Sequence, residues 1–191
     1  MPRSRRVLSR KSHNEGRDVN YRVATIDDCP QLARLRWEFQ TSEGGIPIED
    51  EASFVQRYLA FVRDALQSER LTYWIAESPD GEIVAQMAVF TIRSIPRPSR
   101  GSDQWGYLTD CYTRPAFRNQ GIGQQLLDNV AAWAAARDLE MLVVWPSERS
   151  QPFYERAGFG PENEVRMLRL RDYDGPHSEQ SFVSMHKRPE T

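Results

Sequence analysis

The sequence has no long apolar run and very few cysteines. No stretch approaches the roughly 20 consecutive apolar residues that a helix needs to span a bilayer, so no membrane-spanning helix is predicted. The N-terminus lacks the apolar core of a secretory signal, and we therefore expect a cytoplasmic protein. Cys29 and Cys111 are too few for a disulfide framework, so both thiols are expected to be reduced.

The residues that are present describe a globular chain with an uneven charge distribution. A length of 191 residues suits one domain with a buried core, and 39% hydrophobic with 27% charged residues is typical of a soluble protein. Residues 1–20 hold six basic and two acidic side chains, whereas the remaining 171 residues hold 19 basic and 25 acidic ones. The net charge of −2 thus combines a basic arm with an acidic domain.

The basic arm, residues 1–20, allows two interpretations. It is either a solvated, disordered terminus or a segment that contacts nucleic acid or another anion. The arm contains no aromatic residue that could stack on bases, which disfavours nucleic acid as a partner.

Hydrophobic periodicity and turn residues predict a domain in which strands and helices alternate. The triplet Pro79-Asp80-Gly81 indicates a β-hairpin, and the apolar run 141–145 suits a central strand buried on both faces. The order is βααββ followed by βαβαβ, which gives an α/β or α+β domain with helices flanking a mixed sheet. Strands are expected at 21–24, 71–77, 82–95, 107–113, 141–145 and 165–171. Helices are expected at about 26–39, 51–66, 121–137 and from Pro152 to Gly158. A loop is expected at 97–106.

The segment Arg118-Asn119-Gln120-Gly121-Ile122-Gly123 follows a strand and Pro115 and opens a helix. The first turn of a helix has unpaired N–H groups and the positive end of the helix dipole. Glycines let the backbone approach a phosphate closely, and Arg118 adds a positive charge. This arrangement favours anion binding.

Two nucleotide-binding motifs are excluded by what the segment lacks. A Rossmann fingerprint needs a third glycine where Leu126 stands, and a P-loop needs Gly-Lys-Ser or Gly-Lys-Thr. A loop whose glycines only permit a tight turn remains an alternative.

A second motif supports the anion-binding interpretation. The segment Phe153-Tyr154-Glu155-Arg156-Ala157-Gly158-Phe159 lies about 35 residues later, and Tyr21 to Thr25 with Asp28 and Leu32 opens the domain. Together these features resemble the GNAT superfamily of N-acetyltransferases over roughly residues 21–171. The arm at 1–20 and the polar tail at 172–191 lie outside the resemblance.

The resemblance implies a mixed, mostly antiparallel sheet of six to seven strands, flanked by about four helices, in which strands 4 and 5 splay apart. The pantetheine arm of acetyl-CoA would lie in that gap, held by the backbone of Cys111, Tyr112 and Thr113. The backbone of 118–123 would hold the pyrophosphate. Family members commonly have Asn and Ala where Ser147 and Ser150 stand here, and a serine hydroxyl can still bond a pantetheine amide.

The resemblance also assigns the two proton transfers of an acyl transfer to an amine. Tyr154 matches the tyrosine that protonates the departing thiolate. Asp110 could relay the amine proton through water. Strand alternation, however, places Asp110 on the face opposite Cys111 unless a bulge intervenes. Asp110 could therefore instead orient a neighbouring residue. Covalent catalysis by Cys111 is disfavoured, because no base is placed beside it.

The implied activity is transfer of an acetyl group from acetyl-CoA to a primary amine of a small molecule or peptide, without a metal. The alternative is a CoA-binding regulatory module without catalysis. The acidic residues Glu43, Glu49, Asp50 and Glu51 either attract a cationic amine or form a solvated helix start. Exposed last strands are compatible with a homodimer.

Overall fold

The computed structural model of the protein describes residues 19–42, 46–99 and 101–160. The predicted basic arm lies almost wholly outside these ranges, as do Glu43, the predicted strand 165–171 and the tail 172–191. The predicted domain boundaries therefore stay predictions.

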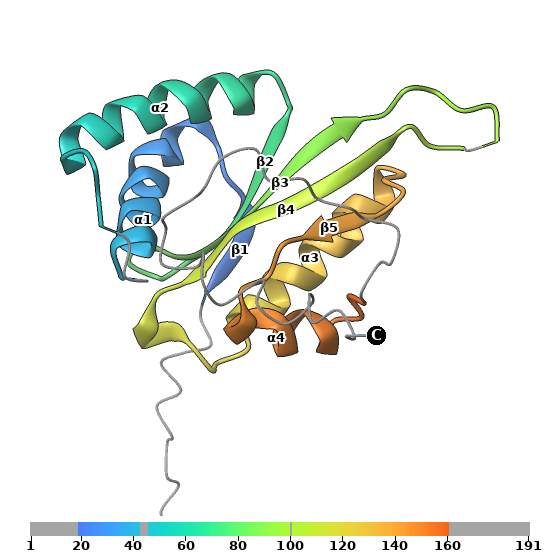
Figure 1. Ribbon diagram of the computed structural model, residues 1–191. Coiled ribbons are helices and arrows are strands. Elements are labelled where there is room, and N and C mark those ends of the chain that lie inside the picture. The colour runs from blue at the N-terminus through green and yellow to red at the C-terminus, as the bar shows by residue number, and fades with distance from the viewer. Residues whose placement is uncertain (1–18, 43–45, 100, 161–191) are drawn as a thin grey trace, which may run out of the picture.

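The described residues form one sheet in the order β1-β2-β3-β4-β5 (Figure 1). Neighbouring strands are antiparallel except β4 and β5, which are parallel, so the mixed and mostly antiparallel sheet is confirmed. The described part holds five strands, fewer than the six to seven expected. These strands are β1 (Asn20–Val23), β2 (Leu71–Glu77), β3 (Ile83–Arg93), β4 (Gln104–Thr113) and β5 (Leu142–Val144).

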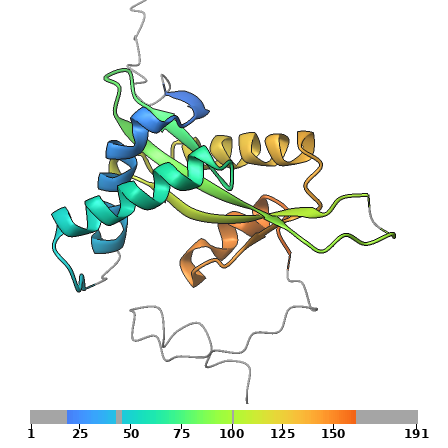
Figure 2. The same cartoon turned by 90° about the horizontal axis from the view of Figure 1, so that it is seen from above.

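Four α-helices cover the two faces of the sheet, as Figure 2 shows from above. They are α1 (Cys29–Ser42), α2 (Glu51–Gln67), α3 (Ile122–Ala136) and α4 (Gln151–Arg156). A first core cluster joins α1 and α2 to one face, with Leu32 and Val62 fully buried. A second cluster joins α3 and α4 to the other face, around Leu126 and Tyr154. Apolar burial on both faces is the main stabilising contribution to such a three-layer arrangement.

Side-chain caps mark the start of α2 and of the turn before α1. Asp50 accepts a hydrogen bond from the backbone N–H of Ser53 and so starts α2. The carboxylate of Asp28 accepts from the N–H of Thr25, three residues earlier, and starts the short 3₁₀ turn that precedes α1. No helix in the described ranges is long and apolar enough to cross a membrane.

A β-bulge interrupts β4. Ala88 pairs with Thr109 and Gln86 pairs with Tyr112, so one residue of β3 faces two of β4. Asp110 lies in this bulge with a φ of 50°, a left-handed conformation that Asp tolerates better than most residues. The bulge reverses the alternation of β4. Leu108 packs in the second core cluster, whereas Tyr112 packs in the first.

The parallel pairing of β4 with β5 is short. It joins Gly106, Tyr107 and Leu108 to Leu142, Val143 and Val144, while β4 continues to Thr113. This separation of β4 from β5 matches the expected splay.

Two expectations for this region are corrected. The β5 residues are only half-buried and Trp145 is exposed, so the run is not a strand buried on both faces. β4 starts at Gln104 inside the predicted loop, because the β3–β4 hairpin is longer than the Pro, Ser and Gly content suggested.

Candidate active site

A cavity of about 260 Å³ lies at the C-terminal end of β4. Four of the residues that line it were predicted cofactor contacts from the sequence, namely Cys111, Tyr112, Thr113 and Arg118. The other two, Phe39 of α1 and Arg149 of the turn before α4, were not predicted as site residues. The structure therefore brings the end of β4 and the first residue of the glycine segment to one hollow.

The side chain of Arg118 is fixed against β4. Its Nε donates a 2.9 Å hydrogen bond to the carbonyl oxygen of Thr113. Its guanidinium carbon lies 5.6 Å from the ring centre of Tyr112, which stacks on Phe39 at 4.9 Å. Cation–π and stacking contacts hold the guanidinium at the cavity wall, where a positive charge favours an anionic ligand.

The glycine segment turns sharply into α3. Asn119 and Gly121 both have positive φ, 61° and 82°, and Gly121 is the residue before the first helical turn. The Gln120 amide donates to the carbonyl oxygen of Ala116, which fixes the loop from inside. Ile122 buries its side chain in the second core cluster. Only its backbone can face a ligand, as expected of a segment that binds through main-chain N–H groups.

The two sequence motifs meet in space at Gly123. A Cβ placed there would lie 3.7 Å from the ring of Phe153 and 3.8 Å from Oγ1 of Thr113. The first turn of α3 therefore packs directly against α4 and the end of β4, which explains why a small residue stands at this position.

Tyr154 and Cys111 are neighbours on the α3 and α4 face of the sheet. The Tyr154 side chain is buried, and burial together with the adjacent Cys111 raises the pKa of its phenol well above 10. Burial likewise raises the pKa of the Cys111 thiol to about 12. This effect outweighs a hydrogen bond with Tyr154, which by itself lowers that pKa. Both groups are protonated at neutral pH. The phenol can donate a proton, and the thiol is a poor nucleophile.

Asp110 points to the opposite face, toward α1 and α2. Its two carboxylate oxygens accept hydrogen bonds from Arg36 at 2.9 Å and from the Tyr73 hydroxyl at 2.6 Å. The Tyr73 hydroxyl is also 2.8 Å from that of Tyr58. Burial raises the pKa of both Tyr73 and Tyr58 well above the ordinary value of a phenol, so these two hydroxyls keep their protons at neutral pH.

Ser147 and Ser150 bond to each other. Their hydroxyl oxygens are 3.1 Å apart, and the Ser150 hydroxyl donates to the Ser147 carbonyl oxygen, which closes the 3₁₀ turn before α4. Neither serine lines the cavity, but Arg149 between them does.

Three further residues belong to the site region, and only part of their role was visible in the sequence. Phe39 stands at the end of the predicted first helix, whereas here it also forms part of the cavity wall. Arg149 stands between the two serines, and its charge just before the second motif was the available signal. Arg36 had no such signal, because its partner Asp110 is 74 residues away.

The sequence profile of the Acetyltransferase (GNAT) family matches residues 30–159, which is more than half of the chain. The chain belongs to the GNAT acetyltransferase family. The family predicted from the two motifs is thereby confirmed. The profile covers both motifs, the bulged β4 and the cavity.

Similar proteins agree with this family. A glucosamine 6-phosphate N-acetyltransferase of Trypanosoma brucei brucei is 27% identical over 100 residues, which are 52% of this chain and 65% of that one. A crystal structure of a predicted acetyltransferase with acetyl-CoA from Clostridium acetobutylicum has a TM-score of 0.70 and 28% identity, over 80% of this chain and 96% of the other. A GCN5-related N-acetyltransferase from Ralstonia eutropha JMP134 has a TM-score of 0.64 and 27% identity, over 78% and 97%.

Proposed function

We propose that this GNAT-family protein transfers the acetyl group of acetyl-CoA to the primary amine of a small molecule or peptide by direct attack. The observation that carries the proposal is the juxtaposition at the end of β4. The cavity at the end of β4 is lined by Cys111, whose thiol interacts with the buried Tyr154, a tyrosine that remains protonated at neutral pH. A C. acetobutylicum relative with the same fold is known with acetyl-CoA.

The described residues fit acetyl-CoA. The first turn of α3 supplies N–H groups and a positive dipole for the pyrophosphate, and Arg118 adds a fixed charge beside them. Beyond Leu108 the pairing with β5 ends, so the backbone of Cys111, Tyr112 and Thr113 could bond the pantetheine arm. The thioester supplies an activated acetyl group, and amide donors directed at its carbonyl oxygen would favour transfer.

Tyr154 is proposed to return a proton to the thiolate of CoA. Its raised phenol pKa keeps the hydroxyl protonated at neutral pH, so the phenol is available to hydrogen-bond the departing thiolate and return a proton to it. Cys111 is proposed to contribute its backbone and the packing of its thiol, since a thiol with a pKa of about 12 supplies little nucleophilic thiolate.

Two roles are open to Asp110. It could accept the amine proton through water, or it could hold the bulge that directs the Cys111 and Tyr112 backbone. Both of its oxygens already accept strong hydrogen bonds, from Arg36 and Tyr73. This observation favours the positioning role.

Calorimetry with acetyl-CoA, followed by a thiol-release assay with an amine panel, tests the proposed function. The panel should include glucosamine 6-phosphate, the sugar phosphate in the name of the T. brucei relative. We expect micromolar binding and amine-dependent release of CoA. Binding with no release from any amine would favour a regulatory CoA-binding module, and no binding would refute both.

The Tyr154→Phe substitution tests the proposed acid. It removes only the hydroxyl, so we expect acetyl-CoA binding to persist while kcat falls by roughly 10²-fold. Tyr21→Phe is the matched control, because Tyr21 packs against the same core cluster outside the cavity. Equal kcat values for the two variants would remove Tyr154 from the mechanism.

A further inference from the structure

Four aromatic side chains form a continuous row on one face of the sheet. They come from four different elements, and consecutive ring centres lie 6.2, 6.5 and 4.6 Å apart. We name this set the aromatic row: Phe61 of α2, Phe90 of β3, Tyr107 of β4 and Trp145, the residue after β5. Spacings of this size are within the range of favourable ring contacts.

The aromatic row is not an ordinary piece of core. Phe61 and Trp145 are each 51% exposed, and Phe90 and Tyr107 are only half-buried. The row therefore presents an apolar surface that is at least partly accessible at each of its four rings. Such surfaces usually bind something.

The row lies on the same face as Asp110. Phe90 packs against the first core cluster and Phe61 belongs to α2, so the rings are on the α1 and α2 side of the sheet. Asp110 reaches Arg36 of α1 from that side as well. Tyr154 and Cys111 are on the other side, where the second cluster packs. A molecule on the row would thus approach the gap from the face opposite the tyrosine acid.

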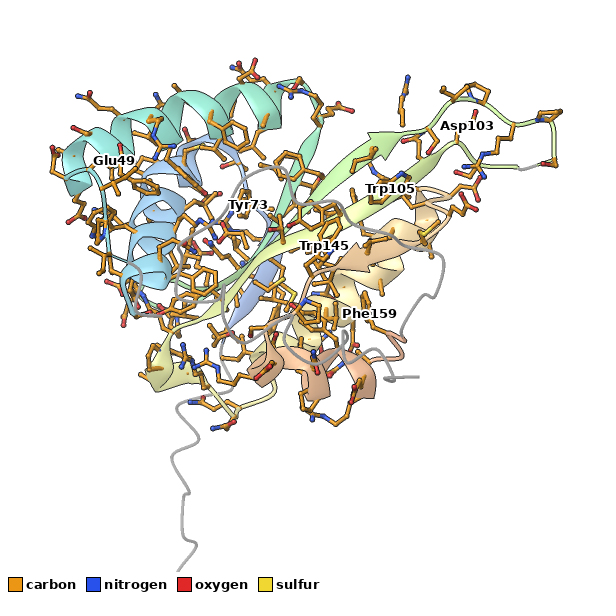
Figure 3. All side chains as sticks on the ribbon, viewed as in Figure 1. Glu49, Tyr73, Asp103, Trp105, Trp145 and Phe159 are labelled. Atoms are coloured by element: carbon orange, nitrogen blue, oxygen red, sulfur yellow. The ribbon has the colours of Figure 1, made fainter. Side chains whose placement is uncertain are left out.

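The row also ends at the point where β4 and β5 separate. Tyr107 precedes Leu108, the last β4 residue that pairs with β5. Trp145, which is labelled in Figure 3, directly follows Val144, the partner of Leu108. Asp110 is three residues beyond Tyr107, which is roughly 10 Å along a strand. A ligand that rests on Trp145 and Tyr107 can therefore extend to the bulge without crossing another element of the described sheet.

From this placement we infer that the aromatic row is the acceptor-binding wall, and that the preferred acceptor is a primary amine on an aryl or arylalkyl body. The inference rests on the proposed acetyl transfer and narrows its substrate. The rings bind the apolar aryl body of the acceptor by stacking and burial. The amine then lies near the bulge, where the strands diverge.

The first test compares amines with and without an aromatic ring in the thiol-release assay, and ethanolamine is the ring-free amine of comparable basicity. We expect tryptamine and phenethylamine to have kcat/KM values at least about tenfold above those of ethanolamine and of glucosamine 6-phosphate. If transfer occurs but ring-free amines are used equally well or better, the inference fails while the proposed function stands. If no amine supports CoA release, the proposed function itself fails.

The second test removes the end of the row. Trp145→Ala should raise KM for tryptamine by about tenfold and leave acetyl-CoA binding unchanged, whereas Trp145→Phe, which keeps a ring, should recover most of the loss. Trp133→Ala is the matched control, because Trp133 lies on α3 and packs with the cluster on the opposite face. All assays are run below the melting temperatures of the variants, so that reduced stability does not enter the comparison.

A dimer interface is the competing use of such a surface, and light scattering decides between the two. We expect the same molecular mass for wild type and Trp145→Ala. A mass that halves on substitution, with an unchanged KM for tryptamine, would assign the row to contact between two copies and overturn the inference. An effect of Trp133→Ala on KM as large as that of Trp145→Ala would overturn it too.

Discussion

At the scale of single residues, Gly106 shows how closely β4 and β5 approach. A Cβ at this position would lie 2.5 Å from a methyl carbon of Leu142 and 2.9 Å from one of Val89. The leucine methyl can move, but a β-branched valine in a strand has little rotamer freedom. The glycine therefore permits the short pairing on which the splay depends.

We expect Gly106→Ala to lower the free energy of unfolding by about 1–3 kcal/mol, the usual cost of overpacking a core. Gly101→Ala is the control, because nothing lies within 4 Å of a Cβ placed there. Urea denaturation followed by fluorescence measures both variants. Equal stability of the two would show that Leu142 and Val89 relax without cost.

At the scale of elements, an ion pair joins β1 to the turn that precedes α1. Arg22 donates to both oxygens of Asp28 and also contacts Glu77 of β2. The hydrogen bonds from Arg22 hold the pKa of Asp28 at about 2, below its usual value near 4. The ionised carboxylate is therefore worth roughly 2 kcal/mol to the folded state.

This pair predicts an acid-sensitive contribution to stability. Because the pKa of Asp28 is lowered by folding, its contribution is present above about pH 4 and is lost as the pH falls toward 2. Asp28→Asn should lower the free energy of unfolding by roughly 2 kcal/mol at pH 7. The difference in the free energy of unfolding between this variant and wild type should narrow as the pH falls from about 4 toward 2. The adjacent, exposed Asp27 supplies the control substitution Asp27→Asn. Urea midpoints at several pH values provide the measurement, and a difference that stays constant down to pH 2 would contradict the assignment.

Elements with a strong local signal could be predicted from the sequence. Helix α2, the hairpin at Pro79-Asp80-Gly81 and the two motifs each depend on neighbouring residues, and each was found at its expected place. The sequence raised a bulge in β4 only as a condition and could not locate it, because residues 107–113 contain no glycine that would mark one. The register between Gln86 and Ala88 of β3 creates it.

At the scale of the whole molecule, the part of the site that escaped prediction consists of contacts between distant segments. Arg36 and Tyr73 reach Asp110 over sequence separations of 74 and 37 residues. The predicted roles of 118–123, Ser147 and Ser150 came from motif resemblance, and binding experiments must still test them. The cavity is consistent with both the motif and the fold, because Arg118 of the glycine segment and the end of β4 line it together.

The hydrogen-bonded chain Tyr58, Tyr73, Asp110 and Arg36 ties both helices of one face to two strands, so we expect Asp110 to contribute to stability. Asp110→Asn keeps a residue that tolerates positive φ but leaves Arg36 without its carboxylate partner. Because Arg36 is partly exposed, we expect a loss of about 2 kcal/mol, less than for a fully buried pair.

The pH dependence of Asp110→Asn distinguishes the two roles open to Asp110. If Asp110 positions the bulge, kcat/KM of Asp110→Asn falls by a similar factor at every pH. Asp110→Ala, whose alanine disfavours the left-handed conformation, then also raises KM for acetyl-CoA. If Asp110 accepts the amine proton, Asp110→Asn removes one limb of the pH–rate profile and leaves acetyl-CoA binding intact. We expect the first result, because Arg36 and Tyr73 already engage both carboxylate oxygens. A profile that loses its acidic limb would instead identify Asp110 as the base.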